Sequence, residues 1–150
     1  MQLDEVLATV RTESVDEAMW SVDNDQRARH YQSAGPAFTR ARLEDLYDLV
    51  RTAVADRDLE PVLGYADRIA EERFTGGFDL SEVQIAFNAL EAALWRHVVA
   101  DSDADHLAES VGLLSTVFGA AKDAMATRYV SLATSRHVPS LDLSAMFRGT

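Results

Sequence analysis

The chain has 150 residues and a formal net charge of −11, and it contains no cysteine. Its length argues for one domain with a sizeable core, and the missing thiols exclude disulfides, zinc–thiolate sites and cysteine nucleophiles. The acidic balance argues against nucleic acid and anionic membrane as partners. No signal peptide pattern opens the chain, and no apolar run reaches the roughly 20 residues that span a bilayer. We therefore expect a soluble cytoplasmic protein.

Apolar residues recur at three- and four-residue spacing through most of the chain, which predicts helices. The first helix is expected over residues 3–22, and the segment RARHYQS predicts a short helical turn. Pro36 suits the first turn of a helix over residues 37–55. Pro61 suits the start of the next one, whose apolar stripe runs to Phe74.

The start of the following helix carries the sharpest local signal. Gly76 and Gly77 stop the preceding helix, and Asp79 stands three residues before Glu82, which is the capping-box spacing. Good helix formers then continue without interruption. We expect this helix to run to about residue 100.

The acidic segment DSDAD separates that helix from the last one, for which Ser102 or Asp103 is the expected N-cap. The last helix is expected to run to about residue 135. The sequence thus predicts an all-α single-domain bundle of five or six helices. Residues 1–138 are expected to form the helical domain, and residues 139–150 a C-terminal tail or the start of a linker. Because of four apolar side chains, that tail is expected either to fold back on the bundle or to serve as a docking peptide for another chain, namely Leu141, Leu143, Met146 and Phe147.

Metal and catalytic motifs are incomplete. The segment DSDADH places acids at positions one, three and five of a calcium loop, but His106 replaces the glycine at position six and Gly112 the glutamate at position twelve. The four histidines form no HxxxH or HExxH pair. No GxSxG elbow and no phosphate-binding glycine loop is present. We predict no metal site, no catalytic residue and no enzyme activity.

One histidine keeps two interpretations open. His97 lies at the boundary of the apolar stripe of the capped helix, four residues before Asp101. It is either a boundary residue bonded to backbone or to an acid, or a haem ligand. Haem is the minority possibility for a cofactor that is otherwise expected to be absent.

A polar group on the last two long helices suggests a contact between them. Lys122 lies on the flank of the last helix, and Glu91 on the corresponding flank of the capped helix. Helices joined by a short loop are antiparallel neighbours. We therefore hypothesise that Lys122 meets Glu91 or Asp123 at a partly buried boundary. The alternative is that Lys122 extends to water and packs only its stem.

The segments RLEDLYDLVRTAV and YADRIAEERFTGGFDLSEVQIAFNALEAALWRHV resemble the N-terminal helical sensor domain of RsbRD-type (RsbT co-antagonist-like) bacterial regulators. The segment AAKDAMATRYVSLA is similar to the last helix of such domains. The resemblance implies a non-enzymatic sensory or protein-interaction domain, commonly dimeric, with no catalytic residues to transfer. It also implies a globin-like arrangement without haem as an alternative to a simple bundle.

Two functions follow from these observations. The first is a bacterial stress-response signalling domain that acts through helix-mediated protein–protein interaction, as a homodimer and with a regulatory partner. Its candidate surface aromatics are Trp20, Tyr31, Tyr65 and Trp95, and the alternative for each of them is packing in the core. The second is a small-molecule or haem sensor with a pocket between the last two long helices. Its candidate lining residues are Phe87, Asn88, Glu91, Trp95, His97, Lys122 and Tyr129.

Overall fold

The computed structural model describes residues 2–137, and in this part of the chain every regular element is a helix. The predicted all-α class is confirmed, with seven helices within residues 2–137 where five or six were expected. In chain order they are α1 (Leu3–Thr9), α2 (Arg11–Asp23), α3 (Arg29–Ala34), α4 (Pro36–Asp56), α5 (Glu60–Thr75), α6 (Leu80–Asp101) and α7 (Leu107–His137).

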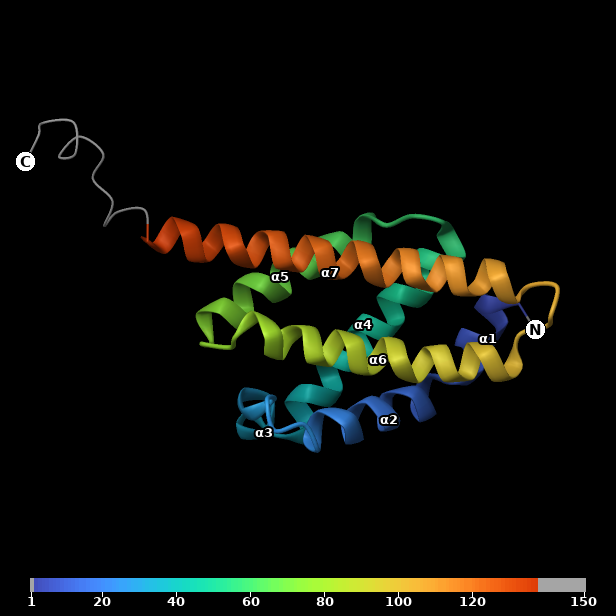
Figure 1. Cartoon of the computed structure of the whole chain (residues 1–150), viewed down its shortest axis with the longest axis horizontal. Coiled ribbons are helices and arrows are strands. Elements are labelled where there is room, and N and C mark those ends of the chain that lie inside the picture. The colour runs from blue at the N-terminus through green and yellow to red at the C-terminus, as the bar shows by residue number, and fades with distance from the viewer. Residues whose placement is uncertain (1, 138–150) are drawn as a thin grey trace, which may run out of the picture.

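The helices form two layers (Figure 1). In one layer α6 lies between α2 and α7 and packs against both. Behind it, α5 packs along α7, and α4 runs obliquely across α6. Helix α4 contacts all six other helices. It is therefore the element around which the domain is assembled.

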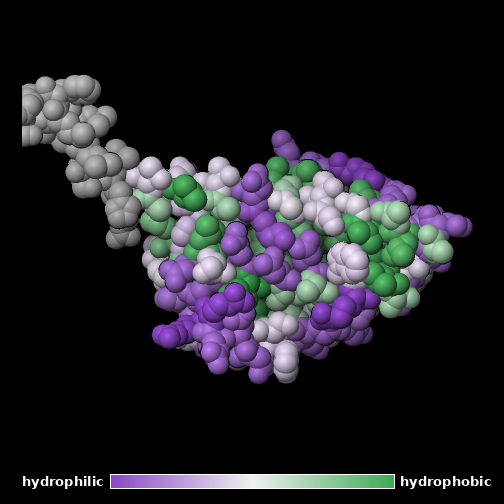
Figure 2. All heavy atoms as spheres, in the orientation of Figure 1, coloured by the Kyte–Doolittle hydropathy of each residue, from purple (hydrophilic) through white to green (hydrophobic). Residues whose placement is uncertain are grey.

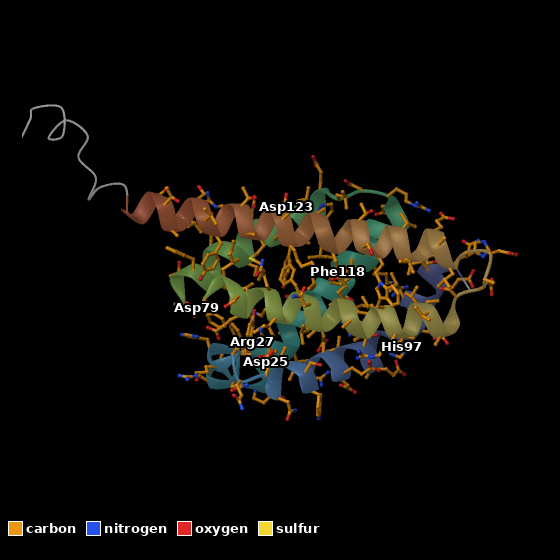
Figure 3. The ribbon with its side chains drawn as sticks, viewed as in Figure 1. Asp25, Arg27, Asp79, His97, Phe118 and Asp123 are labelled. Atoms are coloured by element: carbon orange, nitrogen blue, oxygen red, sulfur yellow. The ribbon has the colours of Figure 1, made fainter. Side chains whose placement is uncertain are left out.

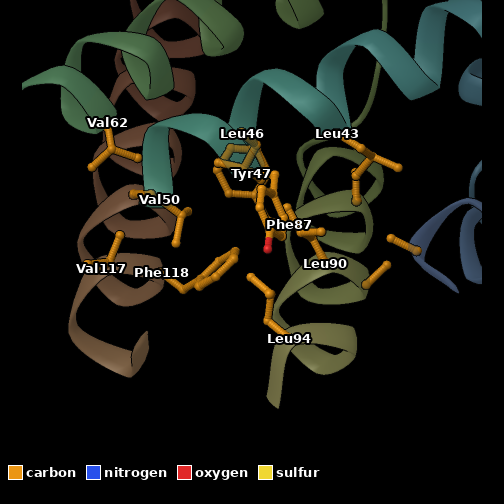
Figure 4. Packing of buried hydrophobic residues seen from close by; sticks show 14 of the residues in the cluster. Leu43, Leu46, Tyr47, Val50, Val62, Phe87, Leu90, Leu94, Val117 and Phe118 are labelled. Atoms are coloured by element: carbon orange, nitrogen blue, oxygen red, sulfur yellow. The ribbon is translucent and has the colours of Figure 1, made fainter. Parts of the chain in front are cut away.

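The core lies where α4, α6 and α7 meet (Figure 4). Helix α4 presents Leu43, Leu46 and Val50 to this core, and Phe118 of α7 packs against them. Each of these side chains is almost fully buried. Tyr47 is buried among them and donates a hydrogen bond from its hydroxyl to the Leu7 carbonyl at 2.5 Å. That bond ties α1 to the centre of the domain.

The expected first helix is two helices. Val10 leaves helical geometry, with φ −112° and ψ 19°, although its N–H still bonds the Val6 carbonyl. Buried residues keep helical spacing on both sides of this break, so the apolar pattern runs through it. The interruption lets α1 and α2 pack separately against α4 and α6.

The expected N-cap of the last helix was wrong. Ser102 is the C-cap of α6, because its N–H bonds the Val98 carbonyl. A turn follows, in which the His106 N–H bonds the Asp103 carbonyl, and α7 begins at Leu107. The acidic residues that suit an N-cap in this segment lie in the connection between α6 and α7.

The predicted tail, residues 139–150, lies outside the described residues. None of the helices within residues 2–137 combines the length and the apolar content that crossing a bilayer requires.

Replacing Tyr47 with Phe tests the bond between α1 and α4. Burial raises the pKa of Tyr47 from its ordinary value of 10.0 to about 12. The unfolded chain therefore ionises first, and Tyr47 contributes stability that is complete below pH 10 and is lost as the pH rises toward 12. We expect Tyr47→Phe to lower the free energy of unfolding by about 1–2 kcal/mol at neutral pH. Above pH 10 the variant should lose stability less steeply than the wild type.

Urea unfolding between pH 8 and 11.5 measures both effects. The matched control is Tyr65→Phe, which removes a hydroxyl bonded to the Arg42 carbonyl at 3.0 Å and leaves α1 untouched. Equal slopes for the wild type and Tyr47→Phe above pH 10 would contradict this account of Tyr47.

Candidate functional site

A buried arginine lies at the end of α5. Arg73 is only 1% exposed and is the largest fully buried side chain of the described residues. Its guanidinium carbon lies 5.5 Å from the ring centre of Tyr31, 4.7 Å from that of Phe38 and 5.3 Å from that of Phe78. Such distances are those of cation–π contacts. We call these four residues, with Arg42 and Glu72, the Arg73 cluster.

Two polar partners hold the guanidinium. Its Nε donates to the Tyr31 hydroxyl at 3.3 Å, and its Nη1 donates to the Glu72 carboxylate at 2.6 Å. Arg42 donates to the same Glu72 oxygen at 2.8 Å and stacks on Phe38 at 4.1 Å. Nη2 of Arg73 is buried and has no hydrogen-bond partner within the described residues. The aromatic rings around the guanidinium are its remaining favourable contacts.

The electrostatics of the cluster favour its charged groups. Burial acts to raise the pKa of Glu72, but hydrogen bonds from Arg42 and Arg73 outweigh burial and lower that pKa below its ordinary value. Burial opposes the charge of Arg73, yet Tyr31 and Glu72 keep its pKa above the ordinary value. Burial also raises the pKa of Tyr31, so its hydroxyl stays neutral. The cluster therefore holds a charged pair and a neutral phenol.

A second buried charge lies beside the cluster. Glu82 is buried, and one of its oxygens lies 2.6 Å from Nδ1 of His30 and 3.3 Å from the Asp79 N–H. Its other oxygen accepts the His30 backbone N–H at 3.0 Å. The predicted capping box of Asp79 and Glu82 is confirmed. The same carboxylate also fastens α3 to the start of α6.

The cluster reaches the last helix through its sequence neighbour. Phe74 packs edge-on against Tyr129 of α7, with ring centres 5.5 Å apart. Among the described helices, α5 and α7 form the most extensive contact of any pair. Groups on α3, α4, α5 and α6 are thereby connected to the C-terminal half of α7.

A smaller polar site joins α6 and α7. The Lys122 ammonium lies 2.7 Å from the Glu91 carboxylate and 3.1 Å from the Asn88 side-chain oxygen. Both charged side chains are mostly buried. The hypothesised contact of Lys122 is thus present, with Glu91 as the partner. We call these three residues the α6–α7 seam.

The other candidate pocket residues lie elsewhere. Phe87 belongs to the core beside α4 (Figure 4), and Tyr129 packs on α5. His97 lies on the side of α6 that faces α2 (Figure 3), where its Nε2 is 3.0 Å from the Glu17 carboxylate. Burial acts to raise the pKa of Glu17, but Arg96 and His97 lower it. The seven candidates are therefore divided among the seam, the core, the α2–α6 contact and, for the exposed Trp95, the surface of α6.

Two of the four candidate surface aromatics pack in the core, which was the alternative for each of them. Tyr31 and Tyr65 are buried, and their hydroxyls bond Arg73 and the Arg42 carbonyl. Trp20 and Trp95 are 68% and 43% exposed. The sequence around an aromatic residue does not show whether that residue will be buried, because its hydrogen-bond partner can lie far away in the chain.

Sequence reasoning missed the roles of Arg73 and His30. Arg73 continues the buried stripe of Ala66, Ile69 and Ala70 at helical spacing, so the position of a charge on the apolar face was a usable signal. His30 carried no such signal, because Glu82 is 52 residues away.

The described residues hold no group of three or more His, Cys, Asp or Glu side chains placed to share a metal ion. In the Arg73 cluster and in the α6–α7 seam, charged side chains on different helices form ion pairs. These ion pairs hold the helices together.

The chain matches the family described as "RsbT co-antagonist protein rsbRD N-terminal domain" over residues 3–137. This match agrees with the resemblance found in the sequence. No curated protein and no solved structure gives a significant match.

Replacing Glu72 with Gln tests the buried charge. The variant leaves the Arg73 guanidinium without its carboxylate. Loss of one partner of a fully buried pair costs about 3–5 kcal/mol, and because Glu72 is half-exposed we expect about 2 kcal/mol. The matched control is Glu71→Gln, which removes the neighbouring carboxylate from its ion pair with exposed Arg128 and should cost less than about 1 kcal/mol.

Thermal and urea unfolding measure both variants. Adding Arg73→Met to Glu72→Gln removes the unpaired charge, so the double variant should recover stability. Equal losses of unfolding free energy for Glu71→Gln and Glu72→Gln would show that the Glu72 carboxylate does not stabilise the buried Arg73 charge.

A double-mutant cycle at Glu91 and Lys122 tests the α6–α7 seam. We expect Lys122→Met and Glu91→Gln each to lower the free energy of unfolding by about 1 kcal/mol, with a coupling energy of about 0.5–1 kcal/mol. Asp123→Asn, next to Lys122 and exposed, serves as the control and should be neutral. A Lys122→Met variant as stable as the wild type would leave Lys122 with a packing role only.

Proposed function

The chain belongs to the family of RsbT co-antagonist rsbRD N-terminal domains, and on that premise we propose that it is a non-enzymatic regulatory domain acting through protein–protein contacts. Its action is to hold or release a conformation that a regulator of the RsbT type recognises. The family match over residues 3–137 is the observation that carries this proposal.

The geometry of the polar groups supports it. Arg73 bonds Tyr31 and Glu72, and Glu82 contacts His30. Lys122 bonds Glu91 in the seam. The Arg73–Tyr31, Glu82–His30 and Lys122–Glu91 contacts join different helices. The Arg73–Glu72 contact lies within α5 and holds the Arg73 side chain in place. Groups that satisfy one another in this way set the relative positions of helices, which is what a conformational relay requires.

The proposal includes two partners and a location. The first partner is a second copy of the chain, and the second is an RsbT-type regulator. The location is the cytoplasm, as the sequence led us to expect. Two exposed apolar side chains on α6, Trp95 and Val99, support interaction with another protein.

A small-molecule or haem sensor is the alternative. The contacts of its candidate residues favour it less. Lys122 is already bonded to Glu91 and Asn88, and Nε2 of His97 faces Glu17. A ligand between α6 and α7 would have to displace these partners. A ligand-dependent rise in melting temperature, or a Soret band, would favour this alternative.

Titration of the 150-residue chain with the RsbT protein of the same organism tests the proposal. We expect a complex by isothermal titration calorimetry with a dissociation constant of about 10⁻⁶ M, equivalent to about −8 kcal/mol. Glu72→Gln should change this affinity more than Glu71→Gln, because only Glu72 contacts the buried Arg73. No heat of binding at about 100 μM, with both proteins folded by circular dichroism, would reject RsbT as the partner.

A further inference from the structure

We propose that a pocket between the starts of α1 and α7 and the end of α4 binds a small free amino acid. The ligand's carboxylate lies at the first turn of α7, and its ammonium group faces Asp4. We call this site the α7 pocket. None of its lining residues belongs to the Arg73 cluster or to the α6–α7 seam, so it is a separate site that the proposed function does not use.

The α7 pocket lies where three helix ends meet. Figure 1 shows the start of α1 beside the turn that joins α6 to α7, at one end of the domain. Helix α4 also ends at the pocket, with Arg57 as its C-cap in the left-handed conformation. The pocket has a volume of about 230 Å³. This is room for roughly seven water molecules, or for a small molecule with a similar number of non-hydrogen atoms.

A buried hydroxyl lines the pocket without a partner. Ser110 of α7 is only 2% exposed, and its side chain makes no hydrogen bond within residues 2–137. The hydroxyl of Thr116, further along the same helix, instead donates to the Gly112 carbonyl at 2.8 Å. Buried polar side chains in native proteins are nearly always hydrogen-bonded. An unpartnered hydroxyl in the wall of a pocket therefore indicates an occupant of that pocket.

Two more polar atoms are buried without a partner just before α7. They are Oγ of Ser102 and Nδ1 of His106, and His106 also lines the pocket. The described residues contain four buried side-chain atoms of this kind, so half of them gather at one turn. This concentration marks the start of α7 as the part of the domain where hydrogen-bonding groups are least satisfied by the chain itself.

The first turn of α7 supplies further donors. The first backbone bond of this helix runs from the Ser110 N–H to the His106 carbonyl at 2.9 Å. The N–H groups of Leu107, Ala108 and Glu109 therefore have no acceptor within the helix. A helix of 31 residues also directs the positive end of its dipole to this turn. Together with the Ser110 hydroxyl, these groups suit the carboxylate of a ligand.

The charges in the other walls require a positive group on the same ligand. Arg57 lines the pocket and bonds Glu109 at 3.1 Å, so these two charges compensate each other. The remaining N–H groups of the Arg57 guanidinium can donate to a second carboxylate. Asp4 also lines the pocket, and one of its oxygens accepts the Glu5 N–H at 3.0 Å. A carboxylate on α1 and N–H donors on α7 fit a ligand with an ammonium group and a carboxylate.

The rest of the molecule favours the same class of ligand. A net charge of −11 repels phosphates and dicarboxylates, whereas a free amino acid has no net charge. Figure 2 shows an apolar area over the C-terminal part of α6 and the N-terminal part of α7. An apolar molecule would prefer that area, and the charged side chains around the α7 pocket suit a small polar one.

Thermal unfolding of the 150-residue chain with glycine, L-alanine and L-serine tests the inference. At about 10 mM, the best of the three should raise the melting temperature by about 5 °C or more, as expected for a dissociation constant of about 10⁻⁴ M. Acetate carries only the carboxylate, and ethylamine carries only the ammonium group. Each of these should raise the melting temperature by less than about 1 °C at the same concentration.

Two variants locate the binding site. Ser110→Ala removes the hydroxyl from the pocket wall, and Arg57→Gln removes the guanidinium. Without ligand, both variants should melt like the wild type, because the hydroxyl has no partner and the Arg57–Glu109 pair is exposed. Each should weaken amino-acid binding about tenfold. The matched controls are Ser115→Ala and Arg51→Gln, which make the same changes at exposed positions outside the pocket and should bind like the wild type.

Amide NMR spectra keep the test valid if a variant fails to fold. The amino acid should change the amide shifts of Leu107, Ala108 and Glu109 in the wild type. If none of the three amino acids changes the melting temperature or these amide shifts, the pocket holds water alone and the inference is overturned. Acetate or ethylamine acting as strongly as the amino acid would also overturn it, as would undiminished binding by folded Ser110→Ala and Arg57→Gln.

Discussion

A guanidinium inside a helical domain is the constraint on which this structure depends. Arg73 is withdrawn from water, and an isolated buried charge is unstable unless it is paired and bonded. Helix α5 alone cannot supply the whole environment. The phenol comes from α3, one ring from α4 and another from the turn before α6. The requirement to surround one charge therefore determines where the short helix α3 lies and how the turn between α5 and α6 is held.

This arrangement gives α7 two different faces. Its inner face contacts the residue next to Arg73, through Phe74 and Tyr129, so its C-terminal half is positioned by the same group of contacts. Its outer face carries almost no charge. In the proposed regulatory role, α7 would carry a change at the Arg73 cluster to its outer face, because both faces belong to one helix.

Local sequence patterns predicted the helices and the capping box, because both depend on spacing within a few residues. Asp79 and Glu82 show how far such reasoning extends. The capping box could be predicted from their separation of three residues, but the contact of Glu82 with His30 spans 52 residues. The same limit applies to Tyr31 and Tyr65, whose burial is decided by distant partners. The seam at Lys122 could be inferred in advance because a short connection fixes α6 and α7 as antiparallel neighbours.

Lys122 is the cation of the seam. It is the only lysine in a chain that otherwise uses arginine. Where a planar fork suits the contact, the chain places arginine, as in the two-pronged bond from Arg11 to Asp48. At the seam a compact ammonium reaches both Glu91 and Asn88 from one point, which a fork would not match. By pairing with Glu91, Lys122 places an opposite charge 2.7 Å from the carboxylate of the seam. In a chain of net charge −11, this local neutrality limits repulsion between the seam and the other acidic side chains. The residue that joins α6 to α7 thus also neutralises the charge that their contact encloses.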